Sequence, residues 1–98
     1  MITYTFSTTK NPSLSQIISA LSSYTMSYST PLSSNTTING SIGLSMKNNV
    51  VVSIQITFFE NVNEYSWKDT ISGYTVTAQP LTTIPSQLVI QNLIGDYL

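Results

Sequence analysis

Apolar and polar residues alternate in several short stretches of this chain, which is the pattern of β-strands that bury one face. The alternation predicts six strands, at residues 2–7, 24–30, 41–46, 50–59, 65–67 and 74–78. A short segment with Asn48 and Asn49 separates the third strand from the fourth, and asparagine tolerates the backbone of a tight turn. We therefore predict a β-hairpin over 41–59, whose second strand is apolar at every even position.

Two further segments carry apolar residues three and four positions apart, which is the period of an α-helix. The first helix is predicted at 13–23, where Ser13 and Gln16 form the sequence pattern of a capping box. The second helix is predicted at 84–94, after the cap residue Thr83.

The predicted order of elements, β-α-β-β-β-β-α, is typical of the α+β class. We expect a mostly antiparallel sheet of four to six strands with two helices packed on one face. Residues 31–40 are neutral and are predicted to form a loop. A helix separates the strands 2–7 and 24–30, so the pattern leaves open whether they run parallel. The whole chain, residues 1–98, is predicted to form a single domain.

The amino-acid composition restricts the possible functions more than the chain length does. Charged residues make up 7% of the chain, against roughly 25% in a typical domain. Ser, Thr, Asn and Gln together account for 43 of the 98 residues, and there is no His, Cys or Arg. The chain therefore lacks the side chains of the usual metal and nucleophilic sites. We predict no metal site, no cofactor and no enzymatic activity.

The few charged residues also limit the partners. Three lysines in a chain of net charge −1 cannot neutralise the phosphates of a nucleic-acid interface, so no nucleic-acid partner is predicted. No stretch approaches the ~18 apolar residues of a membrane span, and none is predicted.

Glu60 and Glu64 are four positions apart with Asp69 nearby, and paired carboxylates are the groups of a glycosidase site. A solvated turn is the simpler interpretation of these three acids.

Aromatic residues supply one candidate binding site. Tyr65 and Trp67 share one face of a predicted strand, and Tyr74 begins the next strand. If they are exposed, the three side chains form a platform for a sugar or an apolar ligand, and if they are buried they belong to the core. A small binding module that uses this platform is the alternative function.

Unprotected sheet edges favour a different function. Natural edge strands carry Lys, Pro or inward charges, but the strands 2–7, 24–30 and 41–46 contain neither Lys nor Pro. Val51 and Phe59 are predicted to be exposed on the reverse face of the long strand, where they would serve self-association. We predict a non-enzymatic structural or interaction protein that forms a homo-oligomer or a larger assembly.

The low charge also bears on where the protein works. Acid unfolding proceeds largely by protonation of carboxylates that are paired in the folded state, and this chain has four acidic side chains. We therefore expect a protein adapted to acidic surroundings, in a virion or outside the cell, with the cytoplasm of a host cell as the alternative location.

Thermal stability is expected to change little between pH 7 and pH 3. A carboxylate whose pKa is lowered in the folded state stabilises the fold above its unfolded pKa and loses this contribution as the pH falls through the folded pKa. Only four side chains can contribute in this way, and no His can become charged. Calorimetry should give a fall in Tm of less than about 15 °C over this range, and a larger fall would contradict the expectation.

Overall fold

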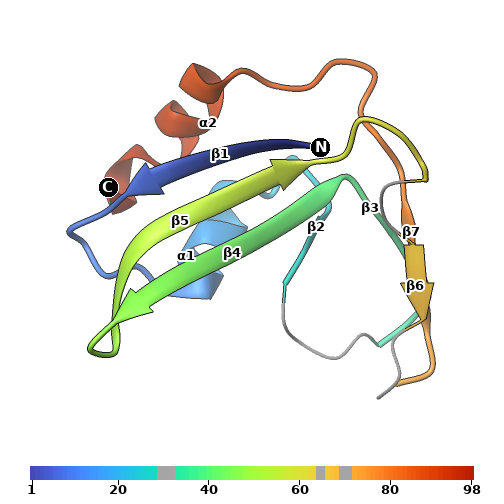
Figure 1. Cartoon of the computed structure of the whole chain (residues 1–98), viewed down its shortest axis with the longest axis horizontal. Helices are drawn as coiled ribbons and strands as arrows, with labels where there is room; N and C mark the ends of the chain where they lie inside the picture. Colours follow the sequence, from blue (N-terminus) through green and yellow to red (C-terminus); the bar gives the residue numbers. More distant parts are fainter. Residues whose placement is uncertain (29–32, 64–65, 69–71) are drawn as a thin grey trace.

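The computed structural model describes residues 1–28, 33–63, 66–68 and 72–98, and for residues 66–68 it describes the backbone. In order along the chain, the elements are β1 (Ile2–Ser7), α1 (Leu14–Ala20), β2 (Met26–Ser27), β3 (Thr36–Ile38), β4 (Gly40–Lys47), β5 (Val50–Phe58), β6 (Ser66–Lys68), β7 (Thr75–Ala78), α2 (Gln87–Leu93) and the 3₁₀ helix η1 (Gly95–Tyr97). The predicted α+β class is confirmed (Figure 1).

Four strands form the main sheet, in the order β1-β5-β4-β2 (Figure 1). β1 and β4 each pair with β5 in the antiparallel direction, whereas the short β2 pairs with β4 in the parallel direction. β1 and β2 therefore run in the same direction but lie at opposite edges of the sheet. This arrangement answers the question that the sequence left open.

The predicted hairpin is confirmed as β4 and β5. Asn48 and Asn49 have φ values of 53° and 63°, the left-handed backbone that a two-residue turn between twisted strands requires. Further along the pair, the register shifts by one residue, so that Val52 has no counterpart in β4. Such a bulge reverses the alternation of side chains. Val51 consequently lies on the same side as Ile54 and is 5% exposed, and the expectation that Val51 is exposed is wrong.

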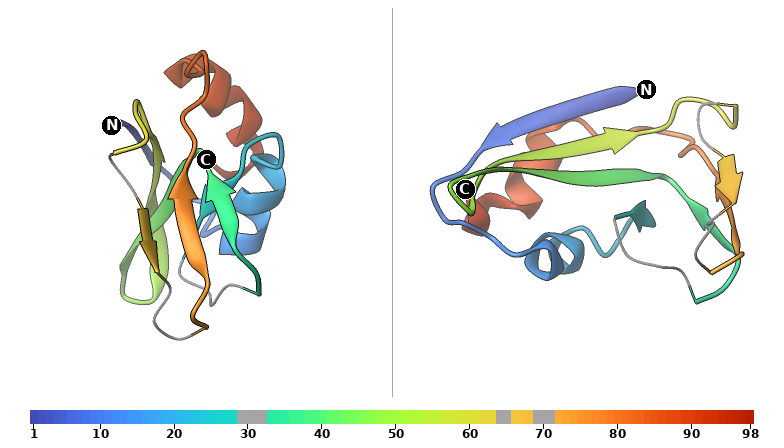
Figure 2. Two further views of the ribbon diagram at one scale, coloured as in Figure 1. Left: turned by 90° about the vertical axis from the view of Figure 1, so that its right-hand side faces the viewer. Right: turned by 60° about the horizontal axis from the view of Figure 1, so that its bottom comes forward.

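A second sheet of three strands, in the order β3-β7-β6, lies at one end of the molecule (Figures 1 and 2). β3 falls within 31–40, so the prediction of a loop there is wrong. Phe59 packs against this sheet with Ile38, Val76 and Ala78. It is 1% exposed, because the second sheet covers the end of β5, and its expected exposure is wrong as well.

Both helices lie on the same face of the main sheet, as predicted (Figure 2). The capping box of α1 is present: the hydroxyl of Ser13 accepts the Gln16 N–H, and the Gln16 side chain accepts the Ser13 N–H. α2 begins later than expected, because its cap is Ser86 and not Thr83. The main core consists of buried side chains from both helices and all four strands of the main sheet: Phe6, Ile17, Leu21, Met26, Ile42, Ile54, Ile56, Phe58, Ile90 and Ile94.

The face of the main sheet that the helices leave uncovered carries neutral side chains, most of them small. They stand in three rows across the sheet, made of Thr3, Thr57 and Ser41, of Thr5, Gln55 and Gly43, and of Ser7, Ser53 and Ser45. The hydroxyl oxygens of Thr3 and Thr57 are 3.1 Å apart. No charged side chain stands in these rows, so the face offers no charge that would repel a second copy.

Asn39 and Gly40 form the corner at which the chain passes from the second sheet to the main sheet. The side chain of Asn39 accepts the Thr25 N–H (2.9 Å) and donates to the Gln79 carbonyl (2.9 Å). Its backbone donates to the Thr25 carbonyl (2.6 Å) and accepts the N–H of Phe59 (3.0 Å). One residue thereby connects the segments that precede β2, follow β5 and follow β7.

Gly40 has no room for a side chain. A Cβ atom there would lie 1.9 Å from the carbonyl oxygen of Thr57, which is backbone of the paired strand β5. At Gly43, by contrast, the nearest atom to a Cβ would be the flexible end of Gln55, 3.7 Å away. The corner therefore specifies glycine for steric reasons, whereas Gly43 on the same strand does not require it.

We expect Gly40→Ala to lower the free energy of unfolding by about 3 kcal/mol or more, since backbone must shift to accept the methyl group. Gly43→Ala is the matched control on the same strand and should change it by less than about 1 kcal/mol. Urea denaturation followed by circular dichroism measures both. Equal effects of the two substitutions would contradict the steric account of the corner.

Candidate functional site

The predicted aromatic platform lies largely outside the described residues. Tyr65 and the side chain of Trp67 are not among them, while Tyr74, just before β7, is 37% exposed. The platform therefore stays a prediction.

The paired carboxylates are likewise only partly described. Glu64 and Asp69 lie outside the described residues. The carboxylate of Glu60 lies 3.0 Å from the N-terminal amine of Met1, and both groups are about half exposed. Within the described ranges, no three His, Cys, Asp or Glu side chains gather where they could hold a metal ion, and no helix is long and apolar enough to cross a membrane.

The outer edge of β1 is the first candidate surface for binding. Residues of an antiparallel strand direct their N–H and C=O groups alternately to one neighbour and away from it. Since the N–H of Thr8 donates to the Val52 carbonyl (3.1 Å), the even residues of β1 bond to β5. The N–H and C=O groups of Thr3, Thr5 and Ser7 therefore point outward, where the described part of the chain supplies no further strand.

The C-terminal residues close one end of this edge. The N–H of Thr9 donates to the carbonyl of Leu98 (3.3 Å), and the hydroxyl of Thr8 donates to the carbonyl of Tyr97. The open part of the edge is therefore limited to the three outward-pointing residues of β1, from Thr3 to Ser7.

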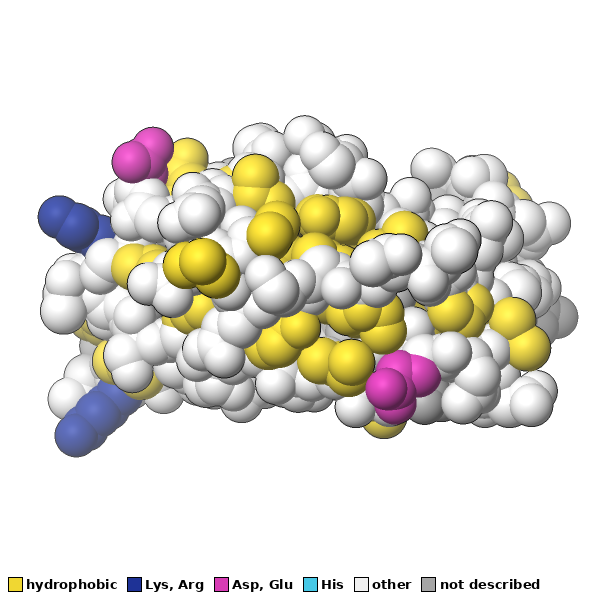
Figure 3. Space-filling view, turned by 90° about the horizontal axis from the view of Figure 1, so that it is seen from above, with side chains coloured by type: hydrophobic (Ala, Val, Ile, Leu, Met, Phe, Trp, Pro, Cys, Tyr) yellow, Lys and Arg dark blue, Asp and Glu magenta, His cyan; other side chains and the backbone are white. Residues whose placement is uncertain are grey.

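Helix α2 runs beside this edge (Figure 1), and three of its apolar side chains are exposed. Leu88, Val89 and Leu93 are 64%, 44% and 40% exposed. The hydroxyl of Tyr4 in β1 donates to the carbonyl of Pro85 just before the helix (2.7 Å) and so ties the two elements together. Figure 3, which views the molecule from the side of β1 and α2, shows hydrophobic side chains in the middle of this face and charged ones toward its rim. We call the outward edge of β1 and the exposed side of α2 the β1–α2 surface.

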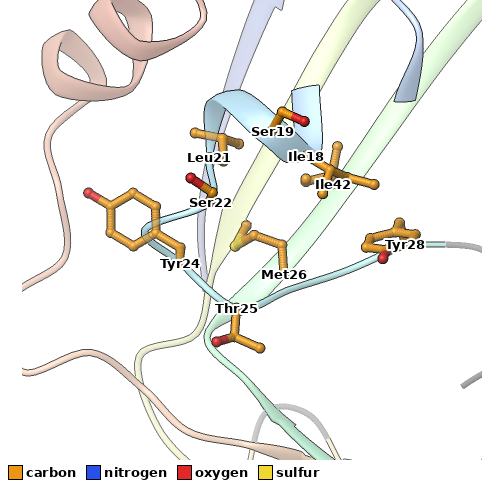
Figure 4. A pocket seen from close by; sticks show the side chains of 9 residues that line it. All are labelled: Ile18, Ser19, Leu21, Ser22, Tyr24, Thr25, Met26, Tyr28 and Ile42. Atoms are coloured by element: carbon orange, nitrogen blue, oxygen red, sulfur yellow. The ribbon is translucent and has the colours of Figure 1, made fainter. Parts of the chain in front are cut away.

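A second candidate surface lies along β4. Its outer edge pairs with β2 only at Gly40 and Ser41. Beyond these residues, two neighbouring hollows of about 420 and 430 Å³ share Tyr28 and Ile42 as walls. The first hollow lies between α1 and β2 (Figure 4), and the second follows the edge of β4 past Leu44. Their volumes are within the range of small-molecule pockets, and their walls are mostly apolar.

Searches of known protein families, of curated proteins and of solved structures find no match for this chain.

The sequence predicts strands that lack edge-protecting residues, but it does not show which of these strands lies at an edge of the sheet. Lys and Pro are absent from all three predicted strands, 2–7, 24–30 and 41–46. The structure places β1 and β2 at the two edges of the main sheet and β4 between β5 and β2. Val51 and Phe59, the residues predicted for self-association, are both buried within the subunit. Exposed apolar side chains lie instead on α2, at Leu88, Val89 and Leu93.

Proposed function

We propose that this protein is a non-enzymatic structural subunit that associates with other copies of itself through the β1–α2 surface. The observation that carries the proposal is the open edge of β1, bordered by exposed apolar residues of α2. Natural proteins protect such an edge with Lys, Pro or an inward charge, and β1 has none of these.

The charge distribution supports the same proposal. With 7% charged residues and a net charge of −1, two copies experience little electrostatic repulsion when they approach. The strand itself, Ile2–Ser7, contains no acidic or basic residue. A subunit of this kind fits an assembly exposed to acid, such as a virion or another extracellular structure, because few carboxylates are available to be protonated.

Thr5→Lys should weaken association without unfolding the subunit. Thr5 is exposed at the middle of the open edge, so the lysine would place a charge where a second strand would pair. We expect the dissociation constant to rise at least about tenfold, which is ~1.4 kcal/mol. Multi-angle light scattering over a concentration series measures it, at neutral and at acidic pH.

Gln55→Lys is the matched control, since Gln55 lies beside Thr5 on the same exposed face but in a strand that is paired on both sides. It should leave the dissociation constant within about threefold of the wild type. If the wild-type protein stays monomeric at hundreds of micromolar at both pH values, the proposal fails.

A small binding module for an apolar ligand is the second candidate function. The observation that favours it is the pair of hollows around Tyr28 and Ile42, which together border α1, β2 and β4. An uncharged ligand of modest size would be held there by burial of apolar surface. This location differs from the aromatic platform, of which Tyr74 is the described member.

Tyr28→Ala should weaken binding of N-phenyl-1-naphthylamine, an uncharged fluorescent probe, roughly tenfold, because it removes the wall that the two hollows share. Tyr74→Ala is the control, and it should leave binding unchanged. The opposite result would favour the aromatic platform, and absence of any binding by the wild type would argue against both ligand sites.

A further inference from the structure

We propose that two copies of this chain pair through their β1 strands in the antiparallel direction, with Thr5 of each copy facing Thr5 of the other across a two-fold axis. The inference rests on the proposed self-association and specifies its partner, symmetry and register. It makes the two main sheets one continuous sheet of eight strands.

The register follows from the outward-pointing backbone groups. In an antiparallel pair, each directly opposed pair of outward-facing residues exchanges two hydrogen bonds. With Thr5 at the axis, Thr3 of each copy faces Ser7 of the other, and all six outward N–H and C=O groups of each strand are satisfied.

Other registers leave groups without a complete partner. A shift by one pairing position in one direction sets Thr3 opposite Thr9, whose N–H is already bonded to Leu98. The opposite shift sets Ser7 opposite Met1, whose terminal amine is held in an ion pair. Either shift therefore leaves only two complete pairs.

The symmetry brings the apolar parts of the two copies together. A continuous antiparallel sheet requires a two-fold axis perpendicular to its plane, so the helices of both copies lie on the same face. α2 is the helix beside β1 (Figure 1), and in this symmetry it therefore approaches α2 of the second copy across the axis. The exposed side chains of Leu88, Val89 and Leu93 become available for mutual burial. The polar rows of the opposite face simply continue across the junction.

Charged groups lie at the ends of β1 and leave its middle neutral. At the Met1 end the carboxylate of Glu60 is paired with the N-terminal amine (3.0 Å), while Lys10 follows the other end of the strand. The outward-facing residues of the strand are Thr and Ser, so no charged side chain opposes the approach of an identical edge at the centre of the junction. A second copy of this chain is therefore the occupant that this edge fits best.

The natural absence of cysteine permits a direct test, because any introduced thiol is unique. Thr5→Cys should form a disulfide-linked dimer under mild oxidation, since opposed residues of a hydrogen-bonded pair have Cα atoms about 5.5 Å apart. Gln55→Cys is the control on the same face. It would lie three strand spacings, roughly 14 Å, from its counterpart and should not cross-link.

The register is tested by mixing two single-cysteine proteins. Thr3→Cys and Ser7→Cys should cross-link with each other, giving a mixed dimer by mass spectrometry, but neither should cross-link with itself. Light scattering on the wild-type protein distinguishes a wrong β1 junction from an absence of self-association. If the protein is oligomeric but Thr5→Cys does not cross-link, the two-fold β1 junction is wrong while self-association stands. If the protein is monomeric, both proposals fall.

Discussion

The corner at Asn39 and Gly40 is the constraint on which the rest of this structure depends. There the chain leaves the second sheet and enters the main one, and the hydrogen bonds of Asn39 join three segments that are far apart in sequence. Gly40 permits the close approach, because any side chain would collide with the backbone of β5. The position of the second sheet, and with it the burial of Phe59, follows from this corner.

The two faces of the main sheet carry different kinds of side chain. One face of the main sheet is covered by helices over an apolar core, and the other presents rows of hydroxyl and amide groups. Among the described residues, the edge of β1 has backbone groups that point outward beside exposed apolar side chains of α2. The low charge leaves few carboxylates that acid could protonate, and it gives two such edges little electrostatic repulsion.

Local patterns predicted the elements where the alternation is regular and flanked by clear turn or cap residues. β1 has the predicted bounds, Asn48 and Asn49 form the expected turn, and Ser13 caps α1. The helices are shorter than the apolar periodicity suggested, because residues that continue the apolar stripe can pack without helical hydrogen bonds. The strand β3 was missed, since its three residues carry no alternation and pair with the distant β7.

The sequence by itself determined the class of the fold, the hairpin, the single sheet face covered by helices, and the scarcity of chemistry-bearing side chains. These properties depend on the local period of apolar residues and on composition. Only the tertiary structure decided which strands are edges and which side chains of the long strand are buried. A one-residue bulge at Val52 and a second sheet over Phe59 reversed the expected exposure. The physical reason is that strand pairing joins residues distant in the chain, and a strand's own sequence does not encode its neighbours.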